Sequence, residues 1–196
     1  MDTETGLRKI KQEVLNCKKC SLYKERLKDG CFPVIGEGSH ISPIMFIGEA
    51  PGFQEAKTGR PFCGASGKIL DELLESIGIN RKEVYICNLL KCRPPNNRNP
   101  KPEEIKVCVP YLERQIDIIK PKVICLLGNY STAYIFQKYG LKEEFQGISK
   151  IHGKIFEVKI LIDLIKIIPL YHPAVAVYNK NMIEVLKKDF QILKNC

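Results

Sequence analysis

The chain has 196 residues, of which 44% are hydrophobic, so it can bury a core and is not a disordered chain. No apolar run is long enough to form a membrane-spanning helix, and the longest candidate, residues 160–170, is interrupted by Asp163 and Lys166. A formal net charge of +9 indicates a polyanionic partner, with a lysine-rich solvated surface as the alternative. The absence of tryptophan and the presence of only three methionines favour a thermophile.

The first residues carry no targeting signal. Residues 1–5 lack the basic start and apolar core of a signal peptide, so we expect a cytoplasmic protein. Disulfides are disfavoured in that compartment, and clusters among the nine cysteines are therefore interpreted first as metal ligands.

Strand and helix patterns alternate along the chain, without an internal repeat or a linker. The expected elements, in chain order, are a helix at 6–16, a strand at 44–47, a helix at 66–77, a strand at 84–87, a helix from 102 to about 119, a strand at 123–128, a helix at 131–139, a strand or hairpin arm at 155–160, a strand at 165–170 and a helix at 180–193. This alternation predicts a three-layer α/β/α domain with a mostly parallel sheet.

Polar and glycine-rich segments follow three of the expected strands. They are the loop Gly48–Gly52, the residue Asn88 and the residue His172. Ligands of parallel sheets bind beyond the carboxyl ends of the strands. We therefore expect these three segments to converge on one crevice.

Four cysteines have spacings that suit an inorganic centre. Cys17 and Cys20 can present two thiolates from one turn, whereas Cys92 precedes the helix that carries Cys108. Such a set can bind zinc or an iron–sulfur cluster, although the long second spacing is unlike a zinc ribbon. The alternative is that Cys92 and Cys108 are buried core thiols. We expect that role for three other cysteines, Cys63, Cys87 and Cys125.

Several motifs together resemble the thermophile-type, iron–sulfur uracil-DNA glycosylases, the fourth family of their superfamily. These motifs are Gly48–Gly52, Thr58–Gly64, Asn88, Cys92–Pro95 and His172–Ala174. The resemblance covers almost the whole chain. It implies one domain over residues 1–196 with a central four-stranded, mostly parallel sheet, and the removal of uracil from DNA. It also implies a [4Fe–4S] cluster, held by the four cysteines Cys17, Cys20, Cys92 and Cys108.

Three residues have the chemistry that a uracil pocket needs. An enzyme that acts on a base flips it into a closed pocket, where Phe62 can stack on its face. The Asn88 amide carries both the donor and the acceptor that a pyrimidine edge requires. A His172 donor can stabilise the charge that develops on O2 of the departing uracil. The alternatives are core packing for Phe62, a turn role for Asn88 and a structural loop role for His172.

The first motif also supplies pocket residues. Backbone amides near Gly48 and Glu49 are expected to help hold the pocket, with Ala50 beside them. Many members of the superfamily have a water-activating aspartate here, which Ala50 cannot replace. Glu49 is the nearest carboxylate and is expected to orient water, with a structural hydrogen bond as an equal alternative. Glu55 lies where the family guards against the thymine methyl group, with a surface carboxylate as the alternative.

One histidine raises a different possibility. A related branch of the superfamily traps the sugar covalently with a loop histidine, and His152 lies in a partly similar segment. We expect His152 to be a surface residue.

DNA contacts are expected on two segments. A proline- and asparagine-rich stretch without acidic residues carries four cations expected to bind phosphates: Lys91, Arg93, Arg98 and Lys101. After His172, either Val175 or Ala176 is expected to enter the base stack.

The sequence thus predicts a monomeric, monofunctional glycosylase that hydrolyses the N-glycosidic bond of deoxyuridine in single- or double-stranded DNA. Its repair or replication partners stay unspecified. The alternative is a non-catalytic iron–sulfur or zinc module that binds nucleic acid. The trio Phe62, Asn88 and His172 argues against that alternative, because a binding module needs no such set at its strand ends.

Overall fold

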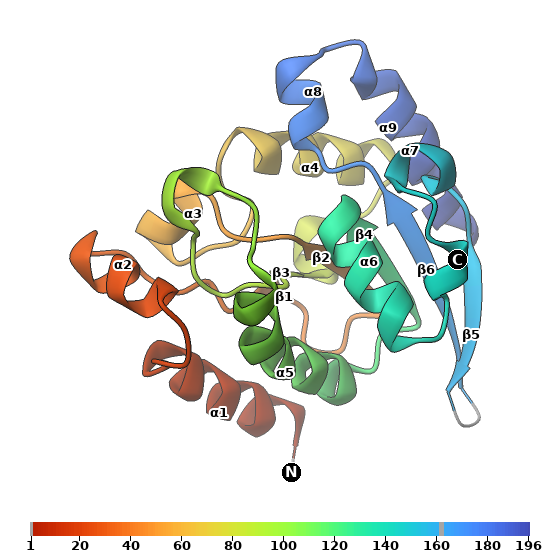
Figure 1. Cartoon of the computed structure of the whole chain (residues 1–196). Coiled ribbons are helices and arrows are strands. Elements are labelled where there is room, and N and C mark those ends of the chain that lie inside the picture. Colours follow the sequence, from red (N-terminus) through yellow and green to blue (C-terminus); the bar gives the residue numbers. More distant parts are fainter. Residues whose placement is uncertain (1, 161–162) are drawn as a thin grey trace.

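A mixed β-sheet forms the centre of the protein (Figure 1). The computed structural model describes residues 2–160 and 163–196. Within these residues the strand order is β1-β3-β2-β4-β6-β5. The strands are β1 (Glu37–Gly38), β2 (Ile44–Gly48), β3 (Tyr85–Asn88), β4 (Val123–Leu127), β5 (Phe156–Ile160) and β6 (Asp163–Leu170). The four central strands run parallel, whereas β1 and β5 pair antiparallel at the two edges.

The sheet confirms the α/β prediction and corrects its size. The expected four parallel strands are present as β3-β2-β4-β6, but the described sheet has six strands because one antiparallel strand is added at each edge. β1 contains only two residues, too few to leave an alternating pattern in the sequence. β5 is the expected hairpin arm and pairs with β6.

Helices cover both faces of the sheet, as the alternation of elements predicts. On one face, α1 (Thr3–Leu15), α5 (Pro102–Ile119) and α6 (Asn129–Lys138) share a hydrophobic core with Met45 and Ile47 of β2. The other face is covered by α4 (Ala65–Ser76), α8 (Ala174–Tyr178) and α9 (Met182–Gln191) (Figure 1). These helices share a core with Phe46 of β2. Successive residues of a strand point to opposite faces, so β2 contributes to both cores.

The remaining elements are short. They are α2 (Leu22–Lys28), α3 (Phe53–Thr58), α7 (Ile148–Ile151) and the 3₁₀ turns η1 (Arg81–Glu83), η2 (Pro95–Asn97), η3 (Lys142–Glu144) and η4 (Ile192–Asn195). Among the described helices, none has both the length and the apolar character needed to cross a membrane.

The carboxyl ends of the parallel strands meet at one edge of the sheet. Gly48 ends β2 directly opposite Asn88, the last residue of β3. His172 follows the end of β6 after one intervening residue. Three segments that are distant in sequence therefore reach the same edge, which is where parallel sheets bind ligands.

Candidate active site and cysteine-lined pocket

A cleft of about 380 Å³ opens at this edge of the sheet. It is lined by six of the predicted pocket residues: Glu49, Ala50, Glu55, Phe62, Asn88 and His172. A cleft of this size can enclose a small molecule. The structure therefore brings together the residues that the strand-end pattern selected.

Two glycines allow Phe62 and Asn88 to pack tightly at the floor of the cleft. A Cβ atom on Gly48 would lie 2.3 Å from Asn88 Oδ1 and 2.7 Å from Phe62 Cζ. A Cβ atom on Gly67 would lie 1.8 Å from the Phe62 carbonyl oxygen. Phe62 itself has a φ of 47°, in the left-handed region that bulky residues rarely adopt. Backbone strain of this kind concentrates at functional sites.

Glu55 fixes the loop that carries Phe62. Its Oε1 atom accepts hydrogen bonds from the backbone N–H groups of Cys63 and Gly64, at 3.0 and 2.9 Å. Because Glu55 lies on α3 and Phe62 precedes α4, these bonds tie the two helices together across the mouth of the cleft. The carboxylate that was expected to guard the pocket is thus also a structural anchor.

Asn88 lines the cleft and carries a buried acceptor. Its side chain is only 2% exposed, and Oδ1 has no hydrogen-bond partner within the described residues. Leaving a buried acceptor without a donor is costly, so an orphan of this kind calls for a specific explanation. A ligand that donates a hydrogen bond in the cleft would satisfy it.

His172 is held as a neutral hydrogen-bond donor. Its Nδ1 atom accepts from the backbone N–H of Ala174 at 3.2 Å, so the ring proton lies on Nε2 in the neutral form. Burial lowers the pKa of His172 to about 4, although Glu55 opposes this shift. The ring stacks beside Phe62, with centroids 5.5 Å apart. At neutral pH the imidazole can therefore donate through Nε2 without carrying a charge.

Glu49 is the half-buried carboxylate of the cleft. Burial raises its pKa, and no hydrogen bond from a described residue opposes that shift. Its backbone carbonyl accepts from Leu90 N–H at 3.0 Å, which fixes the chain but leaves the side chain free to meet a ligand or a water molecule. The described residues thus do not use the carboxylate in a structural hydrogen bond, which favours the functional interpretation.

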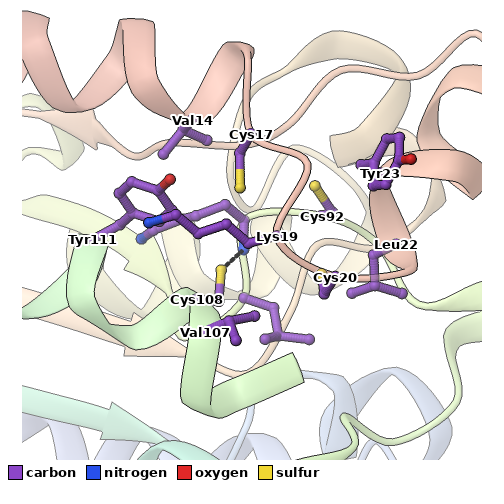
Figure 2. A pocket seen from close by; sticks show the side chains of 12 residues that line it. Val14, Cys17, Lys19, Cys20, Leu22, Tyr23, Cys92, Val107, Cys108 and Tyr111 are labelled. Carbon is purple, nitrogen blue, oxygen red and sulfur yellow. Dashed lines mark hydrogen bonds between the residues drawn. The ribbon is translucent and has the colours of Figure 1, made fainter. Parts of the chain in front are cut away.

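The four predicted ligand cysteines line a second, smaller pocket (Figure 2). Cys17 and Cys20 come from the turn between α1 and α2, Cys92 from the loop after β3, and Cys108 from α5. No three His, Cys, Asp or Glu side chains in the described residues converge closely enough to hold a single metal ion. Zinc needs four ligands around one point, whereas in a [4Fe–4S] cluster each thiolate binds a different iron. Four thiolates are a donor set that either group accepts.

Burial and a hydrogen bond from Lys91 define the environment of these sulfurs. Burial raises the pKa of Cys92 to about 11 and that of Cys108 to about 12, and it also raises the pKa of Cys20. Thiolates are therefore unfavourable here unless a metal compensates their charge. Lys91 N–H donates to Cys108 Sγ at 3.2 Å, which is the kind of contact that supports a ligating sulfur.

Arg26 is a contributor that sequence reasoning missed. It is 8% exposed, and its guanidinium donates to Cys92 Sγ at 3.5 Å. It also donates to the carbonyl oxygens of Leu15 and Cys17, at 3.2 and 3.3 Å, near the end of α1. Arg26 thereby ties the Cys17 turn to Cys92. In the sequence it looks like any other cation of the charged segment 24–28, and no local pattern marks it.

Comparison with known proteins decides the family. The family model described as "Uracil DNA glycosylase superfamily" matches residues 35–194. The chain belongs to this superfamily. A protein of Sulfurisphaera tokodaii named "Type-4 uracil-DNA glycosylase" is 50% identical over 190 residues, which cover 96% of this chain and 84% of that protein.

Two further proteins with the same name support this placement. That of Saccharolobus solfataricus is 47% identical and covers 94% of this chain and 83% of its own length. That of Archaeoglobus fulgidus is 44% identical and covers 93% of this chain and 88% of its own length. The resemblance to the type-4 family found in the motifs is thus confirmed.

One of the DNA contacts expected for this uracil DNA glycosylase superfamily member is wrong. Lys91 is 1% exposed, and its ammonium donates to the Asn88 carbonyl at 2.8 Å and to Gln115 Oε1 at 2.7 Å. Burial lowers its pKa. Lys91 cannot reach a phosphate, because the buried segment of Leu89 and Leu90 continues through it before the loop becomes exposed.

The other three cations differ in the partners that their side chains bind. Arg98 forms a two-pronged ion pair with Glu104, at 2.6 and 2.9 Å. Arg93 Nε donates to Asn97 Oδ1 at 2.7 Å, and its guanidinium lies 5.3 Å from the centre of the Phe53 ring. Lys101 is exposed at the start of α5. Among the residues that the structure describes, Arg93 and Lys101 are therefore the exposed cations of this loop without a carboxylate partner.

The segment after His172 also needs a correction. Ala176 is 4% exposed and packs in the core with α4 and α9, so it cannot enter a base stack. Val175 is half-buried, whereas Val177 is exposed and Tyr178 is 90% exposed and lines the cleft. The short helix α8 turns the chain so that the outward positions lie one or two residues later than expected.

Three more predictions can be compared with the structure. Cys87 and Cys125 are fully buried in strands, as expected for core thiols. Cys63 is only half-buried, on the loop after Phe62, so the core role is wrong for it. His152 is not an ordinary surface residue, because its Nδ1 lies 2.7 Å from Asp189 Oδ2 and its ring packs against Tyr171.

Proposed function

We propose that the protein hydrolyses the N-glycosidic bond of deoxyuridine in DNA, releasing uracil and leaving an abasic site. The observation that carries this proposal is that Asn88, whose buried Oδ1 has no hydrogen-bond partner among the described residues, lines a cleft together with Phe62 and a neutral His172. Membership of the uracil DNA glycosylase superfamily and the names of the type-4 relatives support it.

Asn88 would read the edge of the base after it has been flipped out of the duplex. Uracil presents its N3–H donor next to its O4 acceptor. Asn88 Oδ1 can accept from N3–H while its amide nitrogen donates to O4. Cytosine presents the opposite pattern, an acceptor at N3 and a donor at N4, and would leave both Asn88 groups unmatched. The Phe62 ring at the floor of the cleft provides the surface on which the base stacks.

His172 would stabilise the leaving group. As the bond to the sugar breaks, negative charge develops on uracil O2, and a neutral Nε2–H can donate to it. The bond from Ala174 N–H fixes the tautomer and the orientation of the ring before the substrate arrives. Because the pKa of His172 is about 4, the same neutral form is present across the physiological range.

Glu49 would orient the attacking water. The carboxylate is half-buried in the cleft and unengaged by the described residues. Ala50 lacks a polar side chain, so Glu49 supplies the nearest negative charge for a sugar that becomes cationic as uracil leaves. Monofunctional hydrolysis, without a covalent enzyme–sugar intermediate, fits the pairing of His152 with Asp189.

The DNA would lie across the mouth of the cleft. Arg93 and Lys101 can bind phosphates on one side, and Val177 and Tyr178 can fill the gap left by the flipped nucleotide. Arg98 is partly exposed and would contribute less because Glu104 neutralises it. Whether single- or double-stranded DNA is preferred stays open in this proposal.

We further propose that Cys17, Cys20, Cys92 and Cys108 hold a [4Fe–4S] cluster as a structural cross-link. The cluster would tie the α1–α2 turn to α5 and to the start of the basic loop, the segment 91–101 that carries the expected DNA-binding cations. Protein purified without oxygen should be brown and contain iron and acid-labile sulfide. A colourless protein that carries one zinc would overturn this part of the proposal. That residues 1–196 form one glycosylase domain, that the protein is monomeric and that it is cytoplasmic stay predictions.

The function is tested with an oligonucleotide that contains one uracil. After incubation, alkali cleaves any abasic site, and the product is separated by length. Cleavage at the uracil position that depends on the protein supports the proposal. Binding of the oligonucleotide without release of uracil would favour a non-catalytic nucleic-acid-binding module instead.

A further inference from the structure

Lys91 lies between the two pockets and contacts a residue of each. Its backbone N–H donates to Cys108 Sγ at 3.2 Å, and its ammonium donates to the backbone carbonyl of Asn88 at 2.8 Å. Cys108 lines the cysteine pocket and Asn88 lines the cleft. A single buried residue thus connects the expected cluster ligand with the residue that faces the base.

Gln115 completes the connection from α5. It is fully buried, and its Oε1 accepts from the Lys91 ammonium at 2.7 Å. Its Nε2 donates to the Tyr85 hydroxyl at 2.8 Å and to the Ile35 carbonyl at 3.0 Å. Tyr85 begins β3 and Asn88 ends it. The network therefore holds the strand at both ends and leaves the ammonium little freedom to move.

This network is a costly way to stabilise a fold. Burying an ammonium group carries a large desolvation penalty, and an apolar side chain of similar size often stabilises a protein equally well. The Asn88 side chain, by contrast, has no hydrogen-bond partner for its Oδ1 among the described residues. The orientation of its amide therefore depends on packing against Gly48 and on the backbone to which it is attached, and the Lys91 ammonium binds that backbone.

We propose that Lys91 is a positioning residue: it fixes the Asn88 carbonyl so that the Asn88 amide faces the base correctly. Through its backbone N–H it also links this position to the cysteine pocket. The inference rests on the proposed uracil-excision function. It assigns Lys91 to base recognition through Asn88, in place of the phosphate contact expected from the sequence.

The proposal is tested with a double-mutant cycle of Lys91→Met and Asn88→Ala. Single-turnover release of uracil is measured together with DNA affinity, iron content and thermal unfolding. Lys91→Met should slow release on the order of tenfold while DNA affinity is unchanged, because a small displacement of a substrate-contacting group affects the rate. In the Asn88→Ala background the same substitution should cause no further loss, because its effect passes through Asn88.

Two comparisons separate positioning from a general structural effect. Lys82→Met makes the same substitution at an exposed lysine near the opposite end of β3 and should act at the wild-type rate. Lys91→Gln retains N–H donors and should recover part of the rate lost in Lys91→Met. Both Lys91 variants keep the backbone donor to Cys108, so their iron content should equal that of the wild type.

Several results would overturn the proposal. They are a wild-type rate for Lys91→Met, an equal loss in the wild-type and Asn88→Ala backgrounds, or a loss of iron that accounts for the slower rate. If Lys91→Met does not fold, the same cycle is run with Gln115→Leu, which removes the second acceptor of the ammonium, and additive losses would again reject the proposal. If the wild-type protein releases no uracil, the proposed function itself fails.

Discussion

The cleft and the cysteine pocket are built on opposite principles. In the cleft, polar groups lie without a hydrogen-bond partner among the described residues, as Asn88 Oδ1 and the Glu49 carboxylate show. In the cysteine pocket, the sulfurs of Cys92 and Cys108 already accept hydrogen bonds from Arg26 and Lys91. Polar groups without a hydrogen-bond partner suit a substrate that binds and leaves. Sulfur atoms that already accept hydrogen bonds suit a permanently bound group. The difference predicts separate consequences for changes in each region.

The largest effect is expected for His172→Ala. This change removes the only transition-state donor proposed in the cleft, and such losses cost on the order of a hundredfold or more in rate. DNA affinity should hardly change, because the contact proposed for His172 is with the flipped base and not with the phosphates. Single-turnover kinetics at saturating enzyme measures the rate, and a binding titration measures affinity. A His172→Ala protein that acts at the wild-type rate would show that the cleft is not catalytic.

The next effect tests the cysteine pocket. Cys108→Ser replaces one of the four proposed thiolate ligands and should abolish the iron content and colour. It should also lower the melting temperature, because the proposed link between the α1–α2 turn and α5 would be lost. Cys196→Ser, at an exposed cysteine, is the matched control and should behave as the wild type. If Cys108→Ser keeps its iron but loses catalysis, the division of roles between the two regions is wrong.

The cleft could be predicted from the sequence because its residues follow strands. Asn88 and His172 come directly after apolar runs, and the carboxyl ends of parallel strands meet by necessity. The roles of Lys91 and Arg26 could not be predicted in this way. Each is buried by a distant segment: Lys91 by Gln115 of α5, and Arg26 by the carbonyl groups near the end of α1. Locally, both look like solvated cations.

Two very short elements, α8 and β1, could not be predicted from the sequence. Ala176 and Tyr178 are two residues apart on a five-residue helix, yet one is buried and the other is almost fully exposed. A helix this short has no period from which its outward face can be read. The edge strand β1, with two residues, was missed for the same reason.

A smaller catalytic effect is expected for Glu49→Gln. Burial raises the pKa of Glu49, so the wild-type carboxylate becomes protonated at a higher pH than that of an ordinary glutamate. If the carboxylate orients water, activity is present above this raised pKa and falls as the pH drops through it. Glu49→Gln should be slower by less than the hundredfold typical of a true general base, and its rate should no longer follow this titration. An unchanged pH profile in the variant would assign the titration to another group.

Tyr178→Ala tests whether the exposed ring of Tyr178, which lines the cleft, contacts DNA. The exposed ring should stack on a neighbouring base, so its loss should weaken binding of uracil-containing DNA by roughly tenfold. Tyr178→Phe keeps the ring and should bind almost as the wild type does. Iron content should be unaffected in both variants, because Tyr178 is not part of the cysteine pocket. Equal affinities of the Ala and Phe variants would exclude stacking by this residue.

The smallest effect distinguishes the two arginines of the basic loop. Arg93 pairs with no carboxylate in the described part of the chain. Arg93→Ala should therefore lower the slope of log affinity against log salt by about one, as expected for the loss of one phosphate contact. Arg98 is paired with Glu104, which is 1% exposed and also accepts from Lys101 N–H at 2.9 Å at the start of α5. Arg98→Ala leaves a buried carboxylate without its cation, so it should lower the melting temperature and change the salt slope less than Arg93→Ala does.

The two variants are compared by binding titrations at several salt concentrations and by thermal unfolding. Equal losses of slope would mean that Arg98 exchanges Glu104 for a phosphate when DNA binds, and that the ion pair holds the loop only in the free protein.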